Sequence, residues 1–241
     1  MSEIRGADIG KRAAAEEAVR LVADGMTLGL GTGSTVAFVL DALARRIRAE
    51  GLKLKGVPTS ERTAAQAADL GIPLTDLDRV FELDLAIDGA DEVEEGSLCL
   101  IKGHGGALLR EKIVATAARR FVVVVDDSKI VARLGSHMSV PVEVVRFAHV
   151  ATARRLERLA GPAVLRRGQD GAPYVTDNGN FIYDLGNPGE TAVPIPDPAA
   201  LACALARIVG VVESGLFTGG VERAIVGAAD GSVRTLERLR A

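Results

Sequence analysis

The sequence predicts an α/β protein in which a doubly wound, mostly parallel sheet carries a smaller inserted α+β domain. Strand and helix patterns alternate from residue 8 to residue 127, as they do along such sheets. Four consecutive valines at residues 122–125 suit a central strand that is buried on both faces. Beyond Lys129 the pattern changes to short strands and turns. With 241 residues, 48% of them hydrophobic, the chain can bury a large core.

The first part of the chain supplies the elements of the parallel sheet in order. Apolar residues at helical spacing predict a helix over residues 8–23, and MTLGLG at residues 26–31 then predicts a buried strand that ends in glycines. The elements expected next are a helix from Ser34 to Glu50, a strand at Leu54–Pro58, a helix from Ser60 to Leu70, a strand at Leu83–Ile87, an apolar strand before Lys102, a helix ending near Arg120 and a strand at residues 121–127.

The middle of the chain has the pattern of a small α+β unit. The expected elements are strands at residues 140–145, 163–168 and 173–185, and helices at residues 151–159 and 198–208. Asn178 and Gly179 provide an Asn-Gly turn signal within the third strand segment. Residues 211–239 add strand and hairpin signals that we assign to the first domain.

These patterns predict two domains. The Rossmann-like catalytic domain is expected to comprise residues 1–130 and 205–241, and the small α+β domain residues 131–204. We see no internal repeat and no low-complexity tract.

Composition argues against two classes of partner. A formal net charge of −3 gives no long-range attraction to nucleic acid or anionic membranes, and no apolar stretch approaches the length of a membrane span. Cys99, in an expected strand, and Cys203, in an expected helix, match no metal spacing and are interpreted as buried free thiols. The N-terminal residues lack a signal-type apolar core. We therefore expect a soluble cytoplasmic protein that binds neither nucleic acid nor membranes.

The glycine-rich segment GLGTGST, residues 29–35, indicates a site for a phosphate or a polyol. Small residues allow backbone N–H groups at a helix N-terminus to approach a ligand, and Thr32, Ser34 and Thr35 add hydroxyl groups. The segment is a weak dinucleotide fingerprint because Ser34 stands where the third glycine belongs. No Gly-Lys-Ser/Thr follows, which excludes a Walker motif. The alternative is a tight turn with Ser34 as a simple N-cap.

Two carboxylates follow the strand that ends at Ile87. Asp88 and Asp91 flank Gly89 and Ala90, a spacing that can turn both side chains into one crevice at the carboxyl end of a parallel strand. The alternative is a helix N-cap at Asp88 within a solvated acidic turn. Metal binding is disfavoured because no histidine is close in sequence and the spacing is not that of an EF-hand.

A lysine and a glutamate follow the next apolar strand. Lys102 precedes the loop GHGG, where an ammonium group can neutralise charge that develops on a substrate oxygen. Glu111 is expected on the apolar side of a helix, where burial raises the pKa of a carboxylate and makes it a stronger base. The alternative is an exposed glutamate in the first turn of a helix. His104, His137 and His149 are too scattered for a metal site.

Together these motifs resemble the type A family of ribose-5-phosphate isomerases along nearly the whole chain. The matching motifs are GTGST at residues 31–35, TSERT at 59–63, DGADE at 88–92, KGHGGALLREK at 102–112, DDSK at 126–129, PVEV at 141–144 and TDNGN at 176–180. The resemblance implies a Rossmann-like domain with a smaller, ferredoxin-like α+β domain. It also implies interconversion of ribose 5-phosphate and ribulose 5-phosphate, in the non-oxidative pentose phosphate pathway, without metal or organic cofactor.

The resemblance implies roles for individual residues. Glu111 would move a proton between C1 and C2 of the sugar, and Lys102 and Asp88 would serve the enediolate oxygens. Asp88 is also assigned to ring opening, and Asp91 to orienting sugar hydroxyls. The residues expected to line the substrate site are Thr32, Gly33, Ser34, Thr35, Asp88, Gly89, Ala90, Asp91, Lys102, Gly103, His104, Gly105 and Lys129.

Two residues near this site receive a weaker interpretation. His104 stands where many relatives have a small residue, so we expect its backbone, and not its imidazole, to face the substrate. Lys11 could correspond to a phosphate-binding lysine of some relatives, but we do not assign it to the site.

The resemblance also suggests a homodimer or homotetramer.

Two other classes of protein remain as alternatives. A sugar-phosphate sensing domain of a transcription regulator would need a DNA-binding segment, and too few residues precede the first glycine loop to form one. An amino-sugar phosphate deaminase or a CoA transferase could use Glu111 as base or nucleophile, but the ordered motifs at residues 88–92 and 102–112 argue against both.

Overall fold

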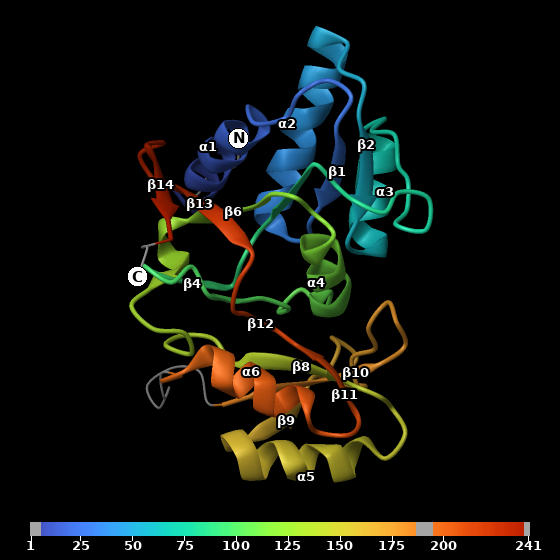
Figure 1. The fold of residues 1–241 in the computed structure, drawn as a ribbon, viewed down its shortest axis with the longest axis vertical. Coiled ribbons are helices and arrows are strands. Elements are labelled where there is room, and N and C mark those ends of the chain that lie inside the picture. The colour runs from blue at the N-terminus through green and yellow to red at the C-terminus, as the bar shows by residue number, and fades with distance from the viewer. Residues whose placement is uncertain (1–5, 187–194, 239–241) are drawn as a thin grey trace.

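A six-stranded sheet forms the centre of the larger part of the molecule in the computed structural model, which describes residues 6–186 and 195–238 (Figure 1). The strand order is β14-β13-β6-β3-β1-β2, and only the β13–β14 pair is antiparallel. The strands are β1 (Thr27–Leu30), β2 (Lys55–Pro58), β3 (Leu85–Asp88), β6 (Phe121–Asp126), β13 (Val221–Gly227) and β14 (Val233–Glu237). The predicted mostly parallel, doubly wound sheet is confirmed.

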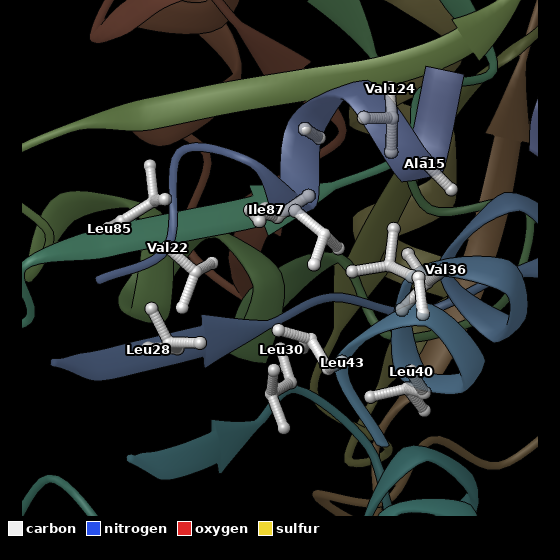
Figure 2. Packing of buried hydrophobic residues seen from close by; sticks show 14 of the residues in the cluster. Ala15, Val22, Leu28, Leu30, Val36, Leu40, Leu43, Leu85, Ile87 and Val124 are labelled. Atoms are coloured by element: carbon white, nitrogen blue, oxygen red, sulfur yellow. The ribbon is translucent and has the colours of Figure 1, made fainter. Parts of the chain in front are cut away.

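Both faces of the central sheet are buried, because its strands present apolar residues in both directions. In β6, Val122 and Val124 belong to one core cluster and Val123 and Val125 to another, as the two-residue period of a strand requires. Helices α1 (Gly6–Val19) and α2 (Ser34–Glu50) cover the first face. Figure 2 shows this packing, with Leu28 and Leu30 of β1 beside Val36, Leu40 and Leu43 of α2.

Two shorter helices complete the larger part. Helix α3 (Glu61–Asp69) follows β2 and contacts α2, and α4 (Leu108–Thr116) contacts β3 on the second face. Figure 1 shows α4 between the central sheet and the smaller part of the molecule. A four-stranded sheet of short strands, in the order β12-β5-β4-β7, lies between the two parts, and its strands are β4 (Glu92–Glu94), β5 (Leu100–Ile101), β7 (Ile130–Val131) and β12 (Leu216–Phe217).

The smaller part is a ferredoxin-like βαββαβ unit. Its elements are β8 (Val140–Val144), α5 (His149–Ala160), β9 (Ala163–Leu165), β10 (Phe181–Leu185), α6 (Pro198–Ala206) and β11 (Val211–Ser214). The sheet has the order β11-β8-β10-β9 and is antiparallel throughout. Leu156 of α5 and Leu205 of α6 pack against Val142 and Val144 of β8 in a separate core. The predicted α+β insert therefore has the expected class.

Strand β11 bears on where the small domain ends. The sequence places residues 205–241 in the first domain, yet β11 pairs with β8 and completes the small sheet. Gly215 then separates β11 from β12, which pairs with β5. We propose that the second boundary lies near Gly215, and that the rest of the predicted division stands. Hydrogen exchange would test the proposal, since the amides of β11 should then open together with those of β8 and not with those of the central sheet.

Several local expectations differ from the structure. The helix predicted over residues 8–23 ends at Val19. The apolar strand before Lys102, predicted as part of the parallel sheet, is the short β5, which pairs antiparallel with β4 and β12 in a different sheet. Residues 173–180 form turns and isolated bridges instead of a continuous strand. Cys203 is exposed, contrary to the expected buried thiol, because it lies on the solvent side of α6; Cys99 is buried as expected. No helix in the described ranges is long and apolar enough to cross a membrane.

Candidate active site

A cavity of about 140 Å³ lies where β1 and β3 end, at the carboxyl edge of the central sheet. Parallel strands of doubly wound folds place their ligands at this edge. The residues that line the cavity are Lys11, Thr32, Gly33, Ser34, Thr35, Gly89, Ala90, Asp91, Lys102, Gly103, Gly105, Glu111 and Lys129. The structure therefore brings together residues 32–35, 89–91 and 102–111 of three sequence motifs, with lysines from two further segments; Asp88 does not line the cavity itself.

The loop after β1 passes directly over Asp88. A Cβ atom on Gly31 would lie 2.1 Å from Asp88 Oδ1, so only glycine allows this approach. The N–H of Thr32 donates to Asp88 Oδ1 at 3.0 Å. Gly33, with a φ of 128°, occupies the N-cap position of α2, and within the described residues no side chain caps this helix. The alternative of a simple N-cap at Ser34 does not hold, and the free N-terminus of α2 opens into the cavity.

Lys102, which lines the cavity together with Glu111, lies between the buried carboxylates of Glu111 and Asp88. Its Nζ is 3.0 Å from Asp88 Oδ2 and 3.5 Å from Glu111 Oε1, and it also donates to Gly89 O. The side chains of all three residues expose 4% of their surface or less. Neither the solvated acidic turn nor the exposed glutamate considered as alternatives agrees with this burial. Three ionisable groups in contact away from water are typical of a catalytic centre.

Burial governs the ionisation of this triad. It raises the pKa of Glu111 to about 8, against the opposing attraction of Lys102. It likewise raises the pKa of Asp88, again opposed by Lys102. Burial alone would lower the pKa of Lys102, but the attraction of Asp88, Glu111 and Asp91 outweighs it and raises that pKa. Among the described residues, Glu111 Oε2 has no hydrogen-bond partner. Glu111 is therefore a base with a raised pKa, next to a lysine whose raised pKa keeps it protonated.

A cluster of hydroxyl groups supports Thr32. The Thr32 hydroxyl lies 2.7 Å from that of Thr59, 2.9 Å from that of Ser60 and 3.2 Å from that of Thr63. Thr63 Oγ1 in turn donates to Gly31 O at 2.8 Å. The sequence analysis named the motif TSERT at residues 59–63 but gave its hydroxyl groups no role in supporting the glycine loop. The cluster fixes the glycine loop through the Thr32 hydroxyl and Gly31 O, in addition to the bond from Thr32 N–H to Asp88.

His104 and Lys129, two predicted site residues, differ in whether they line the cavity. His104 N–H donates to Asp91 Oδ2 at 3.0 Å, and its imidazole Nε2 is 3.0 Å from Ser139 O. His104 does not line the cavity with its ring or its backbone, so the expectation that its backbone faces the substrate stays a prediction. Lys129, at the end of a 3₁₀ turn after β6, does line it, and so does Lys11 of α1. Sequence reasoning noted Lys11 without assigning it, because only the packing of α1 brings it to this edge.

The described residues show no metal centre. No group of three or more His, Cys, Asp or Glu side chains within residues 6–186 and 195–238 is arranged to hold a metal ion.

Comparison with known proteins identifies the family. The family model described as "Ribose 5-phosphate isomerase A (phosphoriboisomerase A)" matches residues 55–231. The chain is 53% identical to ribose-5-phosphate isomerase A of Synechococcus sp. (strain JA-3-3Ab) over 232 residues, which cover 96% of this chain and 98% of that protein. It is 49% identical to ribose-5-phosphate isomerase A of Thermomicrobium roseum over 235 residues, with 98% of this chain and 96% of that protein covered.

Solved structures agree with the sequence matches. Ribose 5-phosphate isomerase A of Methanocaldococcus jannaschii superposes with a TM-score of 0.89 at 45% identity, covering 96% of this chain and 99% of that one. A D-ribose-5-phosphate isomerase in complex with phospho-erythronic acid superposes with a TM-score of 0.90 at 40% identity, with the same coverage. The fold, the cavity with its buried triad and these matches lead to one conclusion: the chain belongs to the ribose 5-phosphate isomerase A family.

Proposed function

We propose that the protein is an aldose–ketose isomerase that interconverts D-ribose 5-phosphate and D-ribulose 5-phosphate. The observation that carries the proposal is the buried contact of Lys102 with Glu111 and Asp88, because Lys102 and Glu111 line a cavity that also has two other lysines, Lys11 and Lys129. The family and the ribose-5-phosphate isomerases among its relatives support the choice of substrate. A base, a cation and a proton-carrying acid are the groups that an enediolate mechanism needs.

The chemistry assigns one step to each member of the triad. Glu111 removes the proton from C2 of the open-chain aldose, and the electron pair moves into a C1–C2 double bond while O1 becomes an oxyanion. Lys102 stabilises that charge, since its raised pKa keeps it protonated. Asp88 exchanges the proton between O2 and O1, and Glu111 then delivers its proton to C1 to form the ketose. Asp88 also assists ring opening, and Asp91 orients sugar hydroxyls.

The other end of the cavity fits the phosphate group. Residues 33–35 open helix α2, whose free N–H groups and dipole attract an anion. Lys11 and Lys129 line the same cavity and can neutralise the two negative charges of a phosphate monoester. In this proposal the phosphate lies at the N-terminus of α2, and the reacting carbons lie beside Glu111 and Lys102. We therefore add Lys11 to the substrate-binding residues that the sequence predicts.

Assembly and location belong to the same proposal. We propose a homodimer or homotetramer in the cytoplasm, which is supported by the family resemblance and by two cysteines that form no disulfide. Light scattering by the purified protein would decide the first point.

The direct test follows the sugar by NMR. Purified protein with ribose 5-phosphate in D₂O and excess EDTA should produce ribulose 5-phosphate with deuterium incorporated at the exchanged carbon. Conversion under EDTA would establish an isomerase that needs no chelatable metal. Binding without conversion would favour a sugar-phosphate sensing domain, and release of ammonia from an amino-sugar phosphate, or a thioester at Glu111, would favour the other enzyme classes.

The pKa of Glu111 predicts the pH dependence of this reaction. Only the ionised carboxylate can remove the proton, so kcat/KM should rise with pH and reach half its plateau near pH 8, with a tenfold loss per unit well below. The substrate phosphate ionises near pH 6, roughly two units lower, so the two limbs can be separated. Initial rates measured across this range test the prediction. A flat profile from about pH 6.5 to about pH 8.5 would contradict a base with a raised pKa.

A further inference from the structure

Arg166 of the small domain reaches the loop that lines the candidate active site. Its Nη1 donates to Gly103 O at 2.7 Å and to His104 O at 3.2 Å. The residue follows strand β9, and its backbone N–H donates to Ile182 O at 2.9 Å. Only 12% of its side chain is exposed. A cation from one part of the molecule therefore binds the backbone of the catalytic loop in the other part.

Asp184 fixes the orientation of this arginine. Arg166 Nε donates to Asp184 Oδ2 at 2.9 Å, and Nη2 donates to Asp184 Oδ1. Such a two-pronged pair holds the guanidinium plane in one orientation. Because Asp184 lies on β10, the sheet of the small domain sets where Nη1 meets the loop. The contact is thus built into the fold and does not depend on a freely rotating side chain.

The geometry of the peptide unit links the Arg166 contact to the cavity. The C=O and N–H of a trans peptide unit point in opposite directions. In the unit between Gly103 and His104 the oxygen faces Arg166, while the N–H donates at 3.0 Å to Asp91, a residue that lines the cavity. In the next unit His104 O also faces Arg166, so the N–H of Gly105, another cavity-lining residue, is directed away from Arg166.

A second contact fixes the end of the same loop. Tyr174 N–H donates to Arg166 O at 2.9 Å, and a Cβ atom on Gly106 would lie 2.1 Å from the Tyr174 hydroxyl oxygen. The φ angles of Gly103 and Gly106 are 105° and 84°, values that side chains disfavour. A loop that glycines make conformationally free therefore needs contacts from outside to keep one shape, and the small domain provides them.

We propose that Arg166 is a positioning residue for the isomerisation. It holds the peptide units of residues 103–105 so that the N–H of His104 stays on Asp91 and the N–H of Gly105 is directed toward the cavity. The inference rests on the proposed function, in which negative charge develops on sugar oxygens beside Lys102. Donors held in place before the reaction need no reorganisation when that charge appears. Arg166 itself does not touch the substrate, and its effect passes through the loop.

Activity measurements separate this role from a merely structural one. Arg166→Met should lower kcat by about 10- to 100-fold with a smaller change in KM, since a small misplacement of catalytic groups has effects of this size. Arg166→Lys should recover part of the loss, because an ammonium group can still bind the carbonyl oxygens although it cannot pair with Asp184 on two sides. Arg167→Met is the matched control, since Arg167 is exposed and its Nη1 contacts only the nearby Gly171 O among described residues.

The amide of Gly105 gives a readout that needs no catalysis. His104–Gly105 is the one His-Gly pair in the sequence, so labelling histidine with carbonyl ¹³C and glycine with ¹⁵N leaves a single cross-peak in a carbonyl-to-amide NMR experiment. We expect this peak to move or broaden in Arg166→Met and to stay in place in Arg167→Met.

The outcomes distinguish the two proposals. Wild type that does not isomerise ribose 5-phosphate would refute the proposed function, while the Gly105 peak would still test the contact. Active wild type with equal kcat in Arg166→Met and Arg167→Met would overturn the positioning role. An unfolding temperature lowered in Arg166→Met without a change in kcat would likewise overturn it. A lowered kcat with a shifted Gly105 peak and partial rescue by lysine would support it.

Discussion

Replacing Glu111 with glutamine should lower turnover of ribose 5-phosphate by about 10²- to 10⁴-fold, the contribution expected from a general base. Glutamine has nearly the same shape but cannot accept the C2 proton. The change should leave the fold intact, because burial raises the pKa of Glu111 to about 8 and the neutral form already predominates at pH 7. Initial rates at saturating substrate and the unfolding temperature measure the two effects.

An exposed glutamate provides the control for that experiment. Glu95 pairs with Arg234 at the surface, with 60% of its side chain exposed. Glu95→Gln should therefore keep wild-type turnover. If Glu111→Gln exchanged solvent deuterium into the sugar at the wild-type rate, proton transfer would belong to another group, even though the family assignment would stand.

Replacing Lys102 with methionine should affect both activity and stability more than any exposed lysine does. Asp88 would stay buried without its cation, and removing one partner of a buried ion pair typically destabilises a protein by about 3–5 kcal/mol. Loss of the charge beside the sugar oxygens should also lower kcat by about 10²- to 10³-fold. Chemical unfolding and steady-state kinetics measure the two losses separately.

The pKa shifts also predict the direction in which the stability of Lys102→Met changes with pH. Burial already raises the pKa of Asp88 and Glu111 above their unfolded values, and removal of Lys102 takes away the attraction that opposes this shift. A carboxyl group with a raised folded-state pKa favours the fold while protonated, and that stability is lost as pH rises through the folded pKa. Lys102→Met should therefore lose stability more steeply than wild type between about pH 5 and about pH 9.

Lys53 offers the comparison for this variant. It is an exposed lysine in the loop before β2, so Lys53→Met should follow the wild-type stability profile. An unfolding free energy of Lys102→Met that rises with pH across the same range would show that the carboxylates find another cation. The assignment of Lys102 as the charge that holds the triad together would then be wrong.

Periodicity and motif order were enough to predict most of the fold. The four valines of β6 are buried on both faces, and the alternation before them forms the parallel sheet. The less regular segments were harder to predict from the sequence. Residues 211–217, VVESGLF, have strand signals on both sides of Gly215, yet the chain divides there between two sheets, and a Cβ atom on Gly215 would lie 2.1 Å from Lys102 O. Such close approach depends on chain segments far apart in sequence.

The sequence by itself determined which groups could do chemistry: glycines for a tight approach, and carboxylates and a lysine at strand ends. These are local choices of residue type, and the ends of β1 and β3 meet at one edge of the parallel sheet, whereas Lys102 follows β5 of the separate short-stranded sheet. Only the tertiary structure decided that Lys102 contacts both Asp88 and Glu111, that Lys11 joins the cavity and that Arg166 holds the loop at residues 103–105. Those contacts depend on distances set by packing between segments, and the spacing of residues along a chain does not contain them.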